Sequence, residues 1–179
     1  MSFHATLGAR YSSTLVHDSI VTPLDVRADV GPMLVLSAAL PLAGPWKLEL
    51  LTDLATSPLR RHDAGSATTI ARVWTLGVSV GLRRRLEPWL EGRAAVGGLK
   101  YVAPGSVGLF SAGSGVIPYG SVAFDAAPEL LARRHLALEI GADLHRFITP
   151  ALRTAGFTDA RVVYRISAGV RVDLRRGGS

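Results

Sequence analysis

Apolar and polar residues alternate over an unusually long segment near the end of the chain. Every second residue from Val162 to Leu174 is apolar, and the positions between them include Arg165, Arg171 and Asp173. Side chains two residues apart lie on the same face of a β-strand, so this segment predicts a strand with one apolar and one polar face. Its length of roughly thirteen residues exceeds the five or six of an ordinary strand and is typical of a strand that crosses a membrane in a β-barrel.

The same alternation recurs in seven earlier segments of the chain. These segments cover residues 3–15, 25–40, 46–55, 69–83, 89–101, 119–126 and 136–145. The pattern slips near Gly98, which predicts a β-bulge there. Short connections that contain proline alternate with longer ones, as in membrane barrels whose two termini both lie in the periplasm. The sequence therefore predicts an all-β fold, an eight-stranded antiparallel up-and-down transmembrane β-barrel, as a single domain over residues 1–176.

Composition excludes several other classes of protein. Hydrophobic residues make up 48% of the chain, but no run of about eighteen consecutive apolar residues suggests a membrane-spanning helix. Cysteine is absent, so neither a disulfide framework nor a cysteine-based metal site is possible. The chain enters a strand pattern at once, and we expect that an export signal peptide has been removed. The final residues 177–179, Gly-Gly-Ser, resemble a linker remnant.

The net charge of +6 does not indicate nucleic-acid binding. Arginine runs at residues 83–85 and 133–134 fall at predicted turns, and neither a basic helix nor an aromatic recognition motif is present. The runs are interpreted as solvated turns that could also meet anionic phospholipid headgroups of the inner leaflet.

Glycine indicates which face of the strands lies inside the barrel. Glycine on a solvated strand face weakens the strand and packs against nothing, whereas inside a narrow barrel it leaves room for long neighbouring side chains. The polar face is rich in glycine, including Gly8, Gly77, Gly141 and Gly169. We therefore expect the polar face inside and lipid outside. A soluble barrel or sandwich, with the apolar face inside, is the alternative.

An inward polar face places many charged side chains in the lumen. Isolated buried charges are costly, so we expect them to pair across strands, and an eight-stranded barrel is just filled by its side chains. The prediction is a plugged lumen with paired charges, and a narrow channel for small solutes is the alternative. The predicted lumen charges are Arg10, Asp25, Arg27, Asp29, Lys47, Glu49, Asp53, Glu91, Arg93, Asp125, Glu139, Asp143, Arg165, Arg171 and Asp173.

Aromatic residues cluster at the ends of the predicted strands. Amphipathic rings favour the boundary between lipid and water, so two aromatic belts are expected there. The predicted interface residues are Phe3, Tyr11, Trp46, Trp74, Trp89, Tyr101, Tyr119, Phe147 and Tyr164.

Strand number, alternation, inward glycines and loop asymmetry together resemble the small outer-membrane barrels of the OmpA transmembrane domain, OmpX and OmpW type. The resemblance implies a location in the bacterial outer membrane, with membrane lipid or detergent around the barrel. The ending Gly169–Leu174 resembles the C-terminal signal that barrel assembly machinery reads, although Leu174 stands where an aromatic residue is usual. The resemblance thus also implies that machinery as a partner.

Candidate chemistry is sparse. Lipid A deacylases of similar topology use a His-x-Ser motif, but this chain has His145-Arg146-Phe147, so a lipid-modifying hydrolase is only an alternative. The histidines lack metal-ligand spacing, and no cofactor motif is present. We expect no catalytic residues, no metal and no cofactor. The long connections 103–118 and 146–160 are candidate sites for an extracellular ligand, because loops on rigid scaffolds often bind. The leading interpretation is a non-enzymatic structural or binding module.

Overall fold

The computed structural model describes residues 1–18, 24–63, 66–103, 114–154, 156 and 160–174. The remaining residues, including the linker remnant predicted at 177–179, lie outside the described part. The described elements are β1 (Ser2–Ser12), β2 (Thr14–Asp18), β3 (Leu24–Ala28), β4 (Gly31–Pro41), β5 (Trp46–Asp63), β6 (Ser66–Glu87), β7 (Leu90–Val102), β8 (Ile117–Ala126), α1 (Glu129–Ala132), β9 (Leu136–Phe147), α2 (Pro150–Thr154) and β10 (Arg161–Leu174). None of the helices described is long and apolar enough to span a membrane.

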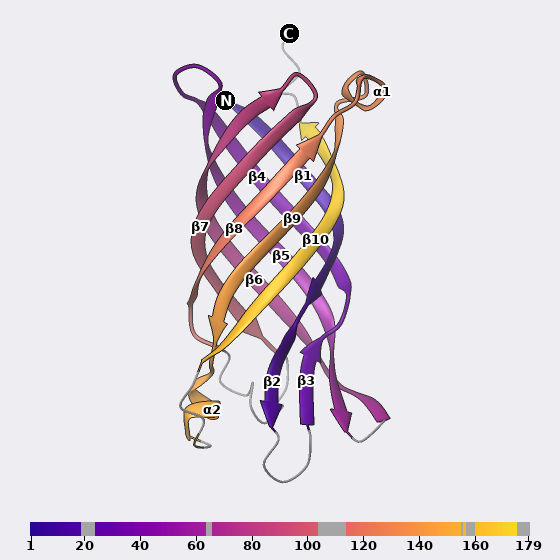
Figure 1. The fold of residues 1–179 in the computed structure, drawn as a ribbon, viewed down its shortest axis with the longest axis vertical. Helices are drawn as coiled ribbons and strands as arrows, with labels where there is room; N and C mark the ends of the chain where they lie inside the picture. Colours follow the sequence, from indigo (N-terminus) through magenta and orange to yellow (C-terminus); the bar gives the residue numbers. More distant parts are fainter. Residues whose placement is uncertain (19–23, 64–65, 104–113, 155, 157–159, 175–179) are drawn as a thin grey trace.

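Eight of the strands form a closed antiparallel ring. Its order is β1, β4, β5, β6, β7, β8, β9 and β10, and β10 pairs with β1 to close it. The start of β1 and the end of β10 lie at the same end of the barrel as α1, whereas α2 lies at the opposite end (Figure 1). We refer to these as the terminal end and the loop end. The predicted eight-stranded antiparallel barrel is confirmed.

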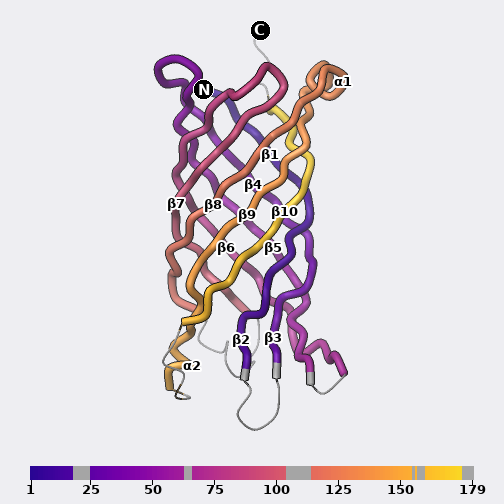
Figure 2. The backbone as a smooth tube through the Cα atoms, viewed as in Figure 1, coloured from indigo at the N-terminus to yellow at the C-terminus, as the bar shows by residue number. Residues whose placement is uncertain are grey.

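The segment predicted as one strand over residues 25–40 is two strands. β3 pairs with β2 and with the far part of β5, and only β4 belongs to the ring. β2 and β3 therefore extend the wall at the loop end (Figure 2). Val26 and Ala28 of β3 are buried, whereas Leu36 of β4 is exposed, so even-numbered residues change faces between the strands. Gly31 lies at this change, where a Cβ would come within 1.9 Å of the Thr56 carbonyl oxygen.

The β-bulge predicted near Gly98 is not observed. β7 pairs with β6 in unbroken register from Val102 to Glu91, and the irregularity lies between Arg85 and Glu87 of β6. The pattern slips at Gly98 because apolar side chains, Leu99 and Tyr101, replace polar ones on the inward face. A change in interior polarity thus resembled a change in strand register.

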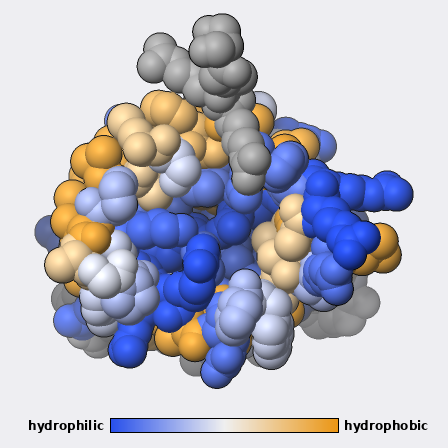
Figure 3. All heavy atoms as spheres, turned by 90° about the horizontal axis from the view of Figure 1, so that it is seen from above, coloured by the Kyte–Doolittle hydropathy of each residue, from blue (hydrophilic) through white to orange (hydrophobic). Residues whose placement is uncertain are grey.

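Apolar side chains cover the outer surface of the ring. Leu7 of β1, Val96 of β7 and Ile140 of β9 all point outward, and Ile140 is 64% exposed. Seen from the terminal end, hydrophilic residues occupy the centre of the barrel and hydrophobic residues surround them (Figure 3). A soluble barrel has the opposite polarity, with apolar side chains inside. The soluble alternative is therefore contradicted.

Candidate functional site: the interior of the barrel

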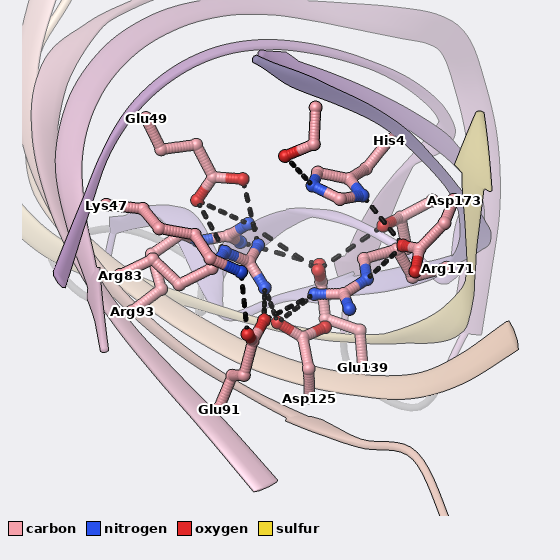
Figure 4. A network of polar contacts seen from close by, with 12 residues as sticks. His4, Lys47, Glu49, Arg83, Glu91, Arg93, Asp125, Glu139, Arg171 and Asp173 are labelled. Carbon is pink, nitrogen blue, oxygen red and sulfur yellow. Dashed lines mark hydrogen bonds and ion pairs between the residues drawn. The ribbon is translucent and has the colours of Figure 1, made fainter. Parts of the chain in front are cut away.

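Arg83 is the centre of an ion-pair network at the terminal end. Its side chain is 0% exposed and projects from β6 into the barrel. Nε and Nη2 donate to the two carboxylate oxygens of Glu49 on β5, at 3.1 and 2.9 Å. Nη1 donates to Asp125 on β8 and to Glu91 on β7, the latter at 3.2 Å. One guanidinium therefore links three carboxylates from three other strands, which satisfies its planar set of donors (Figure 4).

Arg171 extends this network to β10. Its Nη1 lies 3.0 Å from Asp125 and 3.3 Å from Glu91, and its Nε lies 3.4 Å from Asp173. Lys47 reaches Glu91 from β5 at 2.9 Å. The same carboxylates thus bind cations from opposite sides of the barrel, and the network spans the lumen (Figure 4).

The remaining members of this network come from β1, β7 and β9. His4 Nδ1 lies 2.7 Å from Asp173, and because a carboxylate only accepts, this nitrogen is the donor. One step deeper, Arg93 lies 3.5 Å from Glu139, to which the hydroxyl of Thr6 also donates. We call the following residues the terminal network: His4, Lys47, Glu49, Arg83, Glu91, Arg93, Asp125, Glu139, Arg171 and Asp173.

A second set of paired charges lies at mid-barrel. Arg10 donates to Asp53 at 3.0 Å, and Arg165 donates to Asp143 at 2.7 Å. Arg165 also lies 3.8 Å from Asp53, so the two pairs are joined. All four side chains are nearly or fully buried. A void of about 30 Å³, lined by Arg10, Asp53, Asp143 and Tyr119 among others, has room for about one water molecule.

At the loop end the interior is apolar. Side chains from eight strands and α2 form one buried group, which includes Leu59, Val73 and Leu99. Tyr101 and Phe147 meet edge to face there, with ring centroids 5.0 Å apart. The full apolar cluster is Leu15, Val16, Val26, Ala28, Leu59, Val73, Leu99, Tyr101, Ile117, Tyr119, Phe147, Leu152 and Val163. The barrel thus has charges at one end of its interior and hydrocarbon at the other.

The structure gives each predicted lumen charge a place. Three of them, Asp25, Arg27 and Asp29, differ from the prediction. Asp25 is partly exposed and pairs with His17 of β2 at 2.6 Å. Arg27 lies 3.5 Å from Asp29, which also pairs with Arg60 at 3.1 Å, and all three side chains are partly exposed. The change of face between β3 and β4 explains the difference, because Val26 and Ala28 take the inward positions. The others lie inside the barrel in ion pairs, namely Arg10, Lys47, Glu49, Asp53, Glu91, Arg93, Asp125, Glu139, Asp143, Arg165, Arg171 and Asp173.

Arg83 and His4 are network residues that sequence reasoning did not select. Arg83 belongs to a run of three arginines that was interpreted as a solvated turn, whereas β6 continues to Glu87. The signal was present, because Arg83 follows Gly77 and Gly81 at the same alternate positions and therefore shares their inward face.

The predicted interface aromatics separate into two groups. Tyr101, Tyr119 and Phe147 are buried inside the barrel, because the interior around them is apolar rather than charged. The others are 36–52% exposed on the outer surface, namely Phe3, Tyr11, Trp46, Trp74, Trp89 and Tyr164. On β6, ten residues separate Trp74 from Arg84, the partner of Trp46. At about 3.3 Å per residue and a tilt of about 40°, they span about 25 Å, the height of an outer-membrane apolar band.

His145 has no serine partner among the described residues. Its Nε2 is hydrogen-bonded to the hydroxyl of Tyr101 at 3.0 Å, and its Nδ1 lies 3.6 Å from Asp143. Ser167, on the neighbouring strand, bonds to the carbonyl oxygen of Gly141 instead. Nowhere in the described part of the chain do three or more candidate metal ligands gather. The contacts of His145 therefore give it a place in a buried polar group.

Comparisons with known proteins bear on the fold. No model of a protein family matches the chain, and no curated protein matches it. Among solved structures, the outer membrane protein OprG from Pseudomonas aeruginosa is similar over 98% of this chain and 96% of its own, with 11% identity and a TM-score of 0.52. Ail, the attachment invasion locus protein of Yersinia pestis, is similar over 95% of this chain and 97% of its own, with 11% identity and a TM-score of 0.50. The chain therefore has the fold of the small outer-membrane β-barrels, and the predicted resemblance is confirmed at that level.

Proposed function

We propose that this protein is a non-conducting, non-enzymatic barrel of the bacterial outer membrane that acts as a structural or binding module. The observation that carries the proposal is the full burial of Arg83 among carboxylates from three other strands. A charge in that position is held by the fold and is not free to bind a passing solute. Because both termini of such barrels lie in the periplasm, the terminal end would face the periplasm and the loop end would face the outside of the cell.

The interior has two layers along the barrel axis, one of paired charges and one of apolar side chains, and together they favour a closed lumen rather than a narrow channel. A cavity of about 550 Å³ opens at the terminal end, and Lys47, Glu91, Asp125 and Arg171 are among the residues that line it. The void at mid-barrel measures only about 30 Å³. Beyond it, the apolar cluster fills the loop end. Hydrated ions would have to displace paired charges first and then lose their water among apolar side chains.

Planar-bilayer recording tests the closed lumen. The refolded protein should produce no stepwise currents, while its heat-dependent migration in gels confirms that the inserted sample is folded. Reproducible single-channel steps from folded protein would replace the proposal with the channel alternative.

Incubation with lipid A tests the non-enzymatic assignment. We expect the acyl chains to remain in place, because His145 is bonded to Tyr101 and is buried. Release of acyl chains that His145→Ala abolishes would establish the hydrolase alternative instead.

The assembly machinery remains a proposed partner. The end of β10, from Gly169 to Leu174, pairs with β1 in continuous register to close the ring. The long connections 103–118 and 146–160 remain the proposed sites for an extracellular ligand, and residues 104–113, 155 and 157–159 of them lie outside the described part of the chain.

A further inference from the structure

A groove lies on the outer surface of the barrel at the loop end. Its volume is about 540 Å³, and it is formed where β8, β9 and α2 approach one another. Val116, Pro118 and Ile148 supply apolar surface, and Val116 is 77% exposed. Arg146 and Arg153 supply positive charge. We call these five residues the rim groove.

The rim groove lies where the apolar surface of β9 ends. Leu138, Ile140 and Leu144 point outward along β9, and Arg146 takes the next outward position beyond them. Lys100 likewise follows the outward Val96 of β7 at the same end of the barrel, and Arg72 lies just beyond Trp74 on β6. The outward surface thus changes from apolar to basic at the level where the band of hydrocarbon would end.

The guanidinium groups of Arg146 and Arg153 have no carboxylate partner within the described residues. This contrasts with the interior, where each network arginine is paired, and with α1, where Arg133 pairs with Glu129. An unpaired guanidinium at a membrane boundary favours an anion, and its planar donors fit the oxygens of a phosphate.

We propose that the rim groove binds a phosphorylated glycolipid of the outer leaflet, with a phosphate on Arg146 and Arg153. The acyl chains would lie against Val116, Ile148 and the outward apolar side chains of β9. Apolar walls and cationic side chains in one groove match an amphiphile better than a soluble anion, which would leave the walls exposed. This inference rests on the proposed placement in the outer membrane, but it does not require a closed lumen.

The test compares lipid A that carries its phosphates with the same lipid after dephosphorylation. Each is mixed into phosphatidylcholine nanodiscs that contain the folded barrel, and bound lipid is quantified by native mass spectrometry. We expect the phosphorylated form to bind about tenfold more tightly, a ratio that corresponds to about 1.4 kcal/mol. The double variant Arg146→Gln/Arg153→Gln should lose that preference.

Arg133→Gln/Arg134→Gln is the matched control. It removes the same charge from exposed positions at the terminal end, and it should bind both lipids as the unmodified protein does. An equal loss in the control would show that only net charge matters, and equal binding of the dephosphorylated lipid would show that phosphate is not recognised. Full competition by glucosamine phosphate without acyl chains would show a free-anion site. Each of these results would overturn the proposal, whereas bilayer currents bear only on the closed lumen.

Discussion

Arg83 shows how strongly one side chain can depend on its partners. Its guanidinium is fully buried, and the carboxylates around it come from β5, β7 and β8. Removing one member of a buried ion-pair group leaves a buried charge without full compensation. The resulting loss of stability is far larger than the stability that the intact pair adds relative to apolar residues of similar size. Arg83 is therefore the position at which the network is most sensitive to change.

Arg83→Met should lower the free energy of unfolding by about 3–5 kcal/mol, because it removes the hydrogen-bonded cation of Glu49 and Asp125. Among the described residues, Glu49 then keeps only Arg93 as an ion-pair partner, at 3.8 Å, and Asp125 keeps only Arg171, at 3.0 Å. Urea unfolding in detergent micelles, followed by tryptophan fluorescence, measures the difference. Arg83→Lys keeps the charge with fewer donors and should lose less.

Arg85→Met is the control for this prediction. Arg85 is exposed and forms no ion pair among the described residues, so the free energy of unfolding should change by no more than about 0.5 kcal/mol. Equal midpoints for Arg83→Met and Arg85→Met would mean that the network does not stabilise the barrel.

The seam between β1 and β10 depends on close backbone contact. Gly8 and Gly169 lie directly opposite each other, and a Cβ on Gly8 would come within 2.1 Å of the Ala168 carbonyl oxygen. A Cβ on Gly169 would come within 2.6 Å of the Leu7 carbonyl oxygen. Backbone atoms cannot move aside as a flexible side chain can, so the two strands approach this closely only with glycine at both positions.

Gly8→Ala should destabilise the barrel by about 1–3 kcal/mol, because the added methyl group forces the closing strands apart. Gly120→Ala, on β8, should be neutral or slightly stabilising, since nothing lies within 4 Å of its Cβ position. Thermal unfolding by circular dichroism and the folded fraction on unheated gels compare the two variants. A larger effect for Gly120→Ala than for Gly8→Ala would contradict this account of the seam.

Alternation predicted β9 and β10 well, because their inward faces are polar or glycine over most of their length. It failed at β3 and at the end of β7, where the inward residues are apolar, as with Val26 and Leu99. Polarity identifies a strand's inward face only if the interior stays polar. Partners such as Arg83 and Asp125 join strands that are distant in the sequence, so pairing could not be predicted without the fold.

Along the axis of the whole molecule, the outer surface has a tryptophan-bearing level near each end and an apolar level between them. Trp46 and Trp89 lie on the outside near the terminal end, Trp74 lies near the loop end, and the surface between them is apolar. Aromatic side chains are enriched at both boundaries of membrane barrels. The positions of the tryptophans therefore define where the membrane should begin and end.

We expect a variant that keeps only Trp74, with Trp46 and Trp89 replaced by phenylalanine, to report the boundary position. Its tryptophan fluorescence should be quenched more by lipids brominated near the ester groups than by lipids brominated near the ends of the acyl chains. The control places the single tryptophan at the outward mid-strand position Val80, where the order should reverse. If both variants respond alike to the two lipids, the proposed membrane position is wrong.

The apolar cluster makes the two ends of the barrel interior chemically different, and this difference bears on how the barrel would insert into a membrane. A barrel that inserts from the side on which its termini remain must carry its loop end through the hydrocarbon first. Moving charged groups into hydrocarbon is costly, and the loop end encloses mostly side chains that have no such cost. The terminal network stays near the side of entry, and its ion pairs link β5, β7, β8 and β10. Within the lumen, the end that would cross the hydrocarbon first is thus the one with fewer charges, and the charges that must cross with it lie on the outer rim, such as Arg146 and Arg153.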